Sequence, residues 1–232
     1  MAGLLSAWAI VVGAGDGARL GADRPKAFVA LGDRVLLARS VELFEEHPAI
    51  DGIVLVVPEE WEEPASLLAD DLAAGKVTAA VAGGATRAES VAAGLAEVPD
   101  DADLIVVHDA ARPFASAHLV SAVLEALGDT DGAVPGVAVT DTIKRVQGGR
   151  VTETPDRSQL VAVQTPQAFL AGALRRAYGQ PAEAIAAATD CASLVEASGG
   201  TVAVVPGEPG NVKITTAADL ERARERVAEG AG

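Results

Sequence analysis

The chain has 232 residues, half of them apolar, and its 18 Lys and Arg stand against 33 Asp and Glu, giving a formal net charge of −15. That length supports one well-buried domain and is short for two. The negative charge argues against a general binder of nucleic acids or anionic membranes, because such surfaces would repel the chain.

Short β-branched runs alternate with segments rich in Ala, Leu and Glu along the chain. The expected strands are Trp8–Val12, Ile53–Val57, Val77–Val81, Leu104–Val107, Ala133–Val139, Leu160–Val163 and Thr201–Val205. The expected helices are Val35–Glu46, Trp61–Ala73, Arg87–Ala96, Ala117–Leu127, Leu170–Ala177, Ala192–Ala197 and Ala217–Ala228. Runs that are apolar on both faces are typical of strands covered by helices on both sides. The pattern predicts one α/β domain over residues 1–232, in three layers around a mostly parallel sheet.

One segment departs from this alternation. The residues from Thr142 to Thr154 are typical of a β-hairpin that turns at Gly148-Gly149. A hairpin buries too little apolar area to be stable alone. We therefore expect an arm at about residues 140–158 that projects from the domain and packs on a partner subunit.

The cysteine count and the apolar run near the start of the sequence indicate the cellular location of the protein. A single cysteine, Cys191, cannot form an internal disulfide, and one cysteine with three histidines cannot build a zinc cluster. The run Ala7–Ala14 has no preceding Lys or Arg and enters a glycine loop, so it indicates a buried strand and not a signal peptide. No apolar stretch reaches the roughly 18 residues of a transmembrane helix. We expect a soluble, cytoplasmic protein.

A glycine-rich loop follows the first expected strand, where ligands bind in folds of this class. It runs from Gly13 to Leu20 and is followed by Arg24-Pro25-Lys26. The Gly-Lys-Ser/Thr of a P-loop is absent, and Pro25 keeps the segment open where a dinucleotide-binding fold would start its helix. Backbone amides of such a loop approach phosphate closely, although a plain connector without a ligand stays an alternative.

A second group of polar residues ends the strand at Leu104–Val107. Asp109 is placed to meet a ribose hydroxyl or Mg²⁺, and Arg112 to bind a phosphate through two parallel hydrogen bonds. The alternative is an Asp–Arg pair that only fixes a loop. His108 has no recognisable Ser or Cys nucleophile nearby in the sequence, so we interpret it as a structural side chain.

Several further polar motifs say little about function when each is taken alone, but their order and spacing along the chain make the whole set specific. Gly83-Gly84 precedes an expected helix that carries Arg87 and Ser90. A Gly-Gly pair is also common in ordinary strand-to-helix turns that bind no ligand. The remaining positions are Thr142, Arg157, Thr165 within Gln164-Thr165-Pro166-Gln167, Thr189-Asp190, and Lys213-Ile214-Thr215.

Taken together, these motifs resemble the 2-C-methyl-D-erythritol 4-phosphate cytidylyltransferases over about Trp8 to Leu220. The resemblance implies a Rossmann-like nucleotidyltransferase fold and a homodimer formed through the hairpin arm. It also implies transfer of CMP from CTP to methylerythritol phosphate, with Mg²⁺ or another divalent cation. Gly13 stands where the family has Ala, and Cys191 stands where an acidic residue follows Thr-Asp.

The resemblance also implies a role for each site residue. CTP would be bound by Ala14, Gly15, Gly17, Gly84, Ser90, Asp109 and Ala110, with Asp109 as a candidate metal contact. Arg19 and Lys26 would stabilise charge on the α-phosphate, while Arg157, from the neighbouring subunit, and Lys213 would position the acceptor phosphate. The acceptor would be lined by Arg112, Thr142, Arg157, Thr165 and Thr189.

Two alternatives stay open on the sequence. A ribitol 5-phosphate or other polyol-phosphate cytidylyltransferase shares much of this pattern. A non-catalytic nucleotide-binding regulator is disfavoured by the presence of both Arg19 and Lys26.

Overall fold

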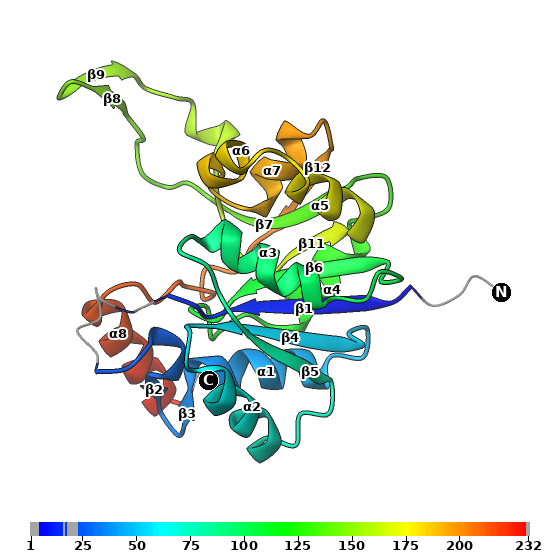
Figure 1. Ribbon diagram of the computed structural model, residues 1–232. Coiled ribbons are helices and arrows are strands. Elements are labelled where there is room, and N and C mark those ends of the chain that lie inside the picture. Colours follow the sequence, from blue (N-terminus) through cyan, green and yellow to red (C-terminus); the bar gives the residue numbers. More distant parts are fainter. Residues whose placement is uncertain (1–4, 16, 18–22, 231–232) are drawn as a thin grey trace.

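A mixed sheet runs through the centre of the molecule (Figure 1). The structure is a computed structural model that describes residues 5–15, 17 and 23–230. Within them, eight strands form the sheet in the order β10-β7-β11-β6-β1-β4-β5, with β12 also paired to β7. These strands are β1 (Ala7–Val12), β4 (Gly52–Val57), β5 (Val77–Ala82), β6 (Leu104–Asp109), β7 (Gly132–Ala138), β10 (Val161–Val163), β11 (Gln167–Leu170) and β12 (Val202–Pro206).

The sheet is parallel except around β10 and β11. Strand β1 pairs in parallel with β4 and β6, β4 with β5, and β7 with β12. Strand β11 is antiparallel to both β6 and β7, and β10 is antiparallel to β7. Gly136 pairs with Val163 of β10 and also with Pro206 of β12, so β10 and β12 lie along opposite edges of β7. The mostly parallel sheet expected from the sequence is confirmed.

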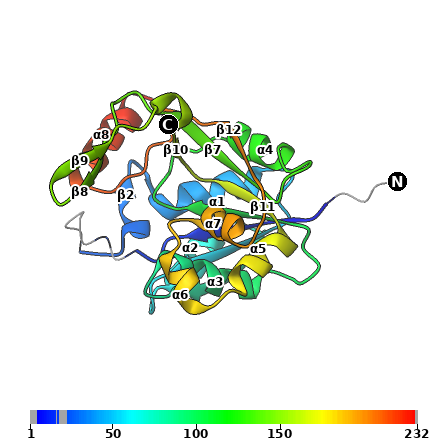
Figure 2. The same ribbon diagram turned by 90° about the horizontal axis from the view of Figure 1, so that it is seen from above.

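Helices cover both faces of this sheet and complete three layers (Figure 2). Helices α1 (Leu36–Glu46), α2 (Glu62–Asp71) and α4 (Ala117–Glu125) pack on one face through residues such as Phe44 and Val123. Helices α3 (Arg87–Glu97), α5 (Ala171–Tyr178) and α7 (Cys191–Ala197) pack on the other through Val91 and Leu174. No helix among the described residues has the length and apolar character needed to cross a bilayer.

Smaller elements flank this core. Helix α8 (Ala217–Ala228) packs through Leu220 and Ala223 on a small cluster with Leu31, next to the short pair β2 (Ala30–Leu31) and β3 (Arg34–Val35). The helix begins with a capping box, in which Asp219 N–H donates to Thr216 Oγ1 and the Asp219 carboxylate accepts from Thr216 N–H. Apart from the two strands of the hairpin arm, the short helix α6 (Ala182–Ala187) and the single turns η2 (Lys26–Phe28) and η3 (Arg157–Gln159) complete the described elements.

The hairpin expected from the sequence is present. Strands β8 (Arg145–Gln147) and β9 (Arg150–Glu153) form a separate two-stranded ribbon that projects from the body of the molecule (Figure 1). Its apolar side chains Val146 and Val151 are 58% and 59% exposed. The described residues of this chain therefore leave these two side chains largely uncovered.

The packing of α3 on the sheet depends on Gly94. A Cβ at this position would lie 2.6 Å from Ile10 Cγ2 and 2.8 Å from Val56 Cγ2, and both neighbours are fully buried. We predict that overpacking in Gly94→Ala costs about 1–3 kcal/mol. Ala normally gains about 1 kcal/mol over Gly in a helix, so the net free energy of unfolding falls by up to about 2 kcal/mol.

Gly172 in α5 is the matched control, because its Cβ would meet only Arg176 Nη1 at 3.5 Å. Urea unfolding of Gly172→Ala should show unchanged or slightly higher stability. Equal free energies of unfolding for Gly94→Ala and Gly172→Ala would contradict the close packing of α3 on β1 and β4.

Candidate active site

Two clefts meet at the edge of the sheet where the parallel strands end. The first has a volume of about 280 Å³ and the second of about 530 Å³. Arg87, Asp109 and Lys213 line both clefts. We call these three residues the shared wall. They come from the start of α3, the end of β6 and the loop before α8.

The first cleft lies between the glycine loop after β1 and the start of α3. Of the residues predicted to bind CTP or its phosphates, it brings together Ala14, Gly15, Gly17, Lys26, Gly84, Ser90, Asp109 and Ala110. Lys213, predicted to position the acceptor phosphate, lines the same cleft. Helix α3 begins with a capping box in which Glu89 N–H donates to Thr86 Oγ1 and Thr86 N–H donates to Glu89 Oε2. Thr86 and Arg87 at this helix start line the first cleft. The positive end of the helix dipole therefore lies at the cleft, which favours an anionic ligand.

Gly17 lets the glycine loop approach Lys26. Its φ of +71° lies in the left-handed region, and a Cβ there would come within 3.1 Å of Lys26 N. A side chain at Gly17 would be strained and would also crowd Lys26. Arg19, the other cation predicted to act on the α-phosphate, lies outside the described residues.

The second cleft contains the predicted acceptor residues Arg112, Thr165 and Thr189. Arg112 is held by two backbone carbonyls, because Nη1 donates to Asn211 O at 2.8 Å and Nη2 donates to Val163 O at 3.3 Å. Its guanidinium therefore ties two loops of the cleft together. The alternative of a simple Asp109–Arg112 pair is not what the structure shows, since the ion pairs of Asp109 are made with other residues.

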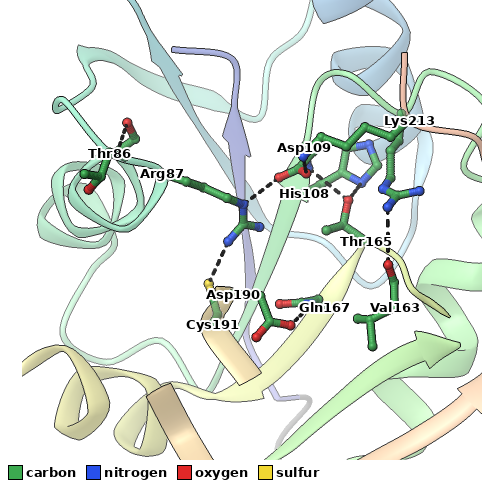
Figure 3. Close-up of polar contacts among 12 residues, drawn as sticks. Thr86, Arg87, His108, Asp109, Val163, Thr165, Gln167, Asp190, Cys191 and Lys213 are labelled. Carbon is green, nitrogen blue, oxygen red and sulfur yellow. Dashed lines mark hydrogen bonds and ion pairs between the residues drawn. The ribbon is translucent and has the colours of Figure 1, made fainter. Parts of the chain in front are cut away.

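Asp109 is the centre of the shared wall (Figure 3). Arg87 Nε donates to its Oδ1 at 2.9 Å, and Lys213 Nζ donates to its Oδ2 at 2.7 Å. Both carboxylate oxygens thus carry a charge-assisted hydrogen bond, the stronger kind in proteins. Burial alone would raise the pKa of Asp109, but the positive charges of Arg87 and Lys213 hold that pKa well below its usual range.

The part of Arg87 in this wall was not assigned from the sequence. Its Nη1 donates to Cys191 Sγ at 3.5 Å (Figure 3). The Tyr178 hydroxyl lies 3.5 Å from the same sulfur. Burial raises the pKa of the Cys191 thiol, which keeps it neutral at physiological pH. Cys191 therefore supports the guanidinium as a neutral acceptor, and Asp109 supplies the negative charge. The sequence indicated this role only through the position of Arg87, three residues before Ser90 in the helix that follows Gly83-Gly84.

Two predicted acceptor residues lie elsewhere. Thr142 and Arg157 are exposed at the base of the hairpin arm, and neither lines either of the two clefts described above. Arg157 Nη1 donates to Thr140 O at 2.5 Å, a contact within the arm. This placement is compatible with the expectation that Arg157 serves a neighbouring subunit.

Protein ligands for a resident metal ion are missing from the described residues of the site. Asp109 is the single carboxylate among the described residues that line the first cleft, and both its oxygens are ion-paired. No group of three or more His, Cys, Asp and Glu side chains is arranged to hold a metal within the described part of the chain. These residues do not fit a metal ion bound by the protein itself.

Comparisons with known proteins agree with this geometry. Residues 7–229 match the family model IspD, described as 2-C-methyl-D-erythritol 4-phosphate cytidylyltransferase. An enzyme of that name from Rhodococcus jostii is 50% identical over 225 residues, covering 96% of each chain. A bifunctional IspD/IspF enzyme from Oleidesulfovibrio alaskensis is 44% identical, and the match covers 92% of this chain and 56% of that protein.

Solved structures give the same result. The 4-diphosphocytidyl-2C-methyl-D-erythritol synthase of Anaerococcus prevotii superposes with a TM-score of 0.84 at 28% identity, covering 97% of this chain and 96% of that one. The 2-C-methyl-D-erythritol 4-phosphate cytidylyltransferase of Thermus thermophilus superposes with a TM-score of 0.75 at 34% identity, covering 95% and 98%.

The shared wall makes a stability prediction that depends on pH. We predict that Asp109→Asn lowers the free energy of unfolding by about 3 kcal/mol at pH 7, because Arg87 and Lys213 lose their counter-charge. The folded-state pKa of Asp109 is depressed, so its stabilisation is present above the unfolded-state pKa of about 4 and is lost as the pH falls below that value. The difference between wild type and variant should therefore narrow below pH 4.

Urea unfolding at pH 7, 5 and 3 measures this difference. Asp100→Asn is the control, because the Asp100 side chain is fully exposed and its pair with Arg175 is long at 3.7 Å. A loss for Asp109→Asn that stays constant from pH 7 to pH 3 would contradict the ion-paired state of this carboxylate.

Proposed function

The chain belongs to the 2-C-methyl-D-erythritol 4-phosphate cytidylyltransferase family, and from this we propose that it transfers CMP from CTP to 2-C-methyl-D-erythritol 4-phosphate and releases pyrophosphate. The observation that carries the proposal is the shared wall of Arg87, Asp109 and Lys213. A transferase must hold donor and acceptor against each other, and two clefts with a common wall meet that requirement.

CTP occupies the first cleft in this proposal. Amides of the glycine loop at Ala14, Gly15 and Gly17 surround its phosphates, and Lys26 lies beside them in the same cleft. Gly84 and Ser90 face the base, while Asp109 and Ala110 face the ribose. Arg19 is proposed to join Lys26 at the α-phosphate.

Methylerythritol phosphate occupies the second cleft. Its hydroxyls find polar partners in Thr165 and Thr189, and Arg112 supplies a positive charge. Lys213 lines both clefts and stands where the acceptor phosphate would meet the α-phosphate of CTP. Its contact with Asp109 fixes the ammonium at that place.

The reaction is a direct displacement at phosphorus. An oxygen of the acceptor phosphate forms a bond to the α-phosphorus of CTP while the bond from that phosphorus to the bridging oxygen of pyrophosphate breaks. A phosphate monoester has a second pKa of about 6 and is largely a dianion at pH 7, so the nucleophile needs no general base. The barrier is electrostatic, and fixed cations at the junction of the clefts lower it.

We propose that Mg²⁺ or another divalent cation enters as part of the nucleotide substrate. The described residues of the first cleft do not provide a set of protein ligands. The phosphate oxygens of CTP are hard ligands that suit Mg²⁺. The ion offsets part of the triphosphate charge.

We propose that the active form is a homodimer. The arm exposes Ile143, Val146 and Val151, and a second copy of the chain would cover them. Thr142 and Arg157 at its base would then reach the second cleft of the partner. A cytoplasmic location is proposed from the sequence alone, on the single cysteine.

Pyrophosphate release tests the proposed reaction. With CTP, Mg²⁺ and methylerythritol phosphate, we predict turnover that exceeds turnover with ribitol 5-phosphate, and CTP should exceed ATP, GTP and UTP as donor. Preference for ribitol 5-phosphate would assign the chain to another polyol phosphate. No release with either acceptor would favour a nucleotide-binding regulator.

Mixing two inactive variants tests the shared dimer site. We predict that Lys26→Ala lowers kcat by about 10²–10³-fold, the usual cost of removing one preorganised charge-stabilising group, and that Arg157→Ala is similarly impaired. A mixture should regain activity, because a heterodimer has one site with both residues intact. Each variant alone, at the same total concentration, is the control. No recovery, with subunit exchange shown by mass spectrometry, would place Arg157 in the site of its own chain.

A further inference from the structure

His108 is a buried polar side chain to which the proposed reaction gives no part. It lies in β6 immediately before Asp109 and is 0% exposed. Its ring meets Phe44 edge to face, with centroids 5.5 Å apart. Its Nδ1 is hydrogen-bonded to Thr165 Oγ1 at 3.1 Å (Figure 3), and the backbone of Arg112 is a second hydrogen-bonding neighbour of the ring. A buried imidazole lowers stability unless its polar atoms are hydrogen-bonded, so the bond to Thr165 helps to hold the ring in the core.

The Thr165 hydroxyl makes a second hydrogen bond with the same strand. The backbone N–H of Asp109 donates to Thr165 Oγ1 at 3.0 Å. Two consecutive residues of β6 therefore hold one hydroxyl, one through its backbone and one through its side chain. Thr165 is itself 4% exposed and lines the second cleft.

The Thr165 hydroxyl keeps one free hydrogen-bonding position. A hydroxyl has one proton and two lone pairs. The Asp109 amide uses one lone pair, and His108 uses either the proton or the other lone pair. One position of the Thr165 hydroxyl is left for a ligand atom, and it has a fixed direction because the other two are occupied.

We propose that His108 is a positioning residue that orients the Thr165 hydroxyl toward the acceptor in the second cleft, an inference that rests on the proposed function. The acceptor chemistry it serves is a hydroxyl or phosphate oxygen of a polyol phosphate. His108 acts through Thr165 and touches no substrate, since its ring is fully buried.

The electrostatics of the ring support positioning over proton transfer. Burial lowers the pKa of His108 to about 4, and the positive charges of Arg112 and Arg87 act in the same direction, while Asp109 opposes them. The ring is therefore neutral at physiological pH. A neutral, solvent-inaccessible imidazole serves as a fixed hydrogen-bonding group.

The test compares His108→Leu with His108→Asn, assayed by pyrophosphate release. Asn keeps a hydrogen-bonding atom near the place of Nδ1, whereas Leu keeps only the bulk. We expect Leu to lower kcat/KM for the acceptor by about 10- to 100-fold, the range for losing one or two well-placed hydrogen bonds. The KM for CTP should stay unchanged, because Thr165 does not line the first cleft. Asn should recover most of the loss.

A double-mutant cycle with Thr165→Val separates positioning from general destabilisation. If His108 acts through the hydroxyl, His108→Leu should cost nothing further once the hydroxyl is gone. The proposal would be overturned if the losses in kcat/KM from His108→Leu and Thr165→Val were additive. It would also be overturned if His108→Leu impaired the use of CTP and of the acceptor equally, or if His108→Asn did not recover kcat/KM for the acceptor. Thermal unfolding of each variant checks that the compared proteins are folded.

The inference and the proposed function can fail separately. Absence of turnover by the wild-type enzyme with every polyol phosphate would refute the proposed function. In that case the crystal structures of wild type and His108→Leu decide the positioning role alone. We expect the Thr165 hydroxyl to change rotamer in the variant, and an unchanged rotamer would overturn the inference.

Discussion

The ion pairs of Asp109 with Arg87 and Lys213 are the interaction on which both clefts depend. A buried carboxylate between two cations brings together residues that lie 22 positions before it and 104 positions after it. Removing Asp109 would leave Arg87 and Lys213 without their counter-charge, whereas removing either cation would leave one ion pair. The same contacts that join the start of α3 to the loop before α8 therefore also fix the cations at the junction of the clefts.

The ion pairs of Asp109 also explain where the positive charges of this acidic chain lie. A chain with a net charge of −15 keeps several cations at one edge of its sheet. Arg87 and Lys213 are held by Asp109, and Arg112 by the carbonyls of Val163 and Asn211. Carbonyl partners leave the charge of Arg112 uncompensated by a direct ion pair. The site is thus positive within an acidic protein, as a binding place for two phosphate-bearing substrates requires.

The layered fold and most of its elements could be predicted from the sequence because fully apolar strands and amphipathic helices carry a periodic signal. Strand β11 was missed because Gln167–Leu170 is four residues long and continues directly into α5. The predicted residues Lys26, Asp109, Thr165 and Lys213 do line the clefts. Arg87 was not assigned, and His108 was interpreted only as a structural side chain. Their partners, Asp109 and Thr165, are contacts of the folded sheet that no local spacing encodes.

Stereochemistry at the transferred phosphorus tests the central claim most directly, since adjoining clefts imply one direct displacement. Thr165 and His108 form a hydroxyl–imidazole pair at 3.1 Å, which in another setting could act as a covalent nucleophile. The measurement uses CTP with a single sulfur configuration at the α-phosphorus, followed by analysis of the product configuration. Direct attack by the acceptor phosphate predicts inversion. Retention would show two displacements through an enzyme-bound CMP and would contradict the account.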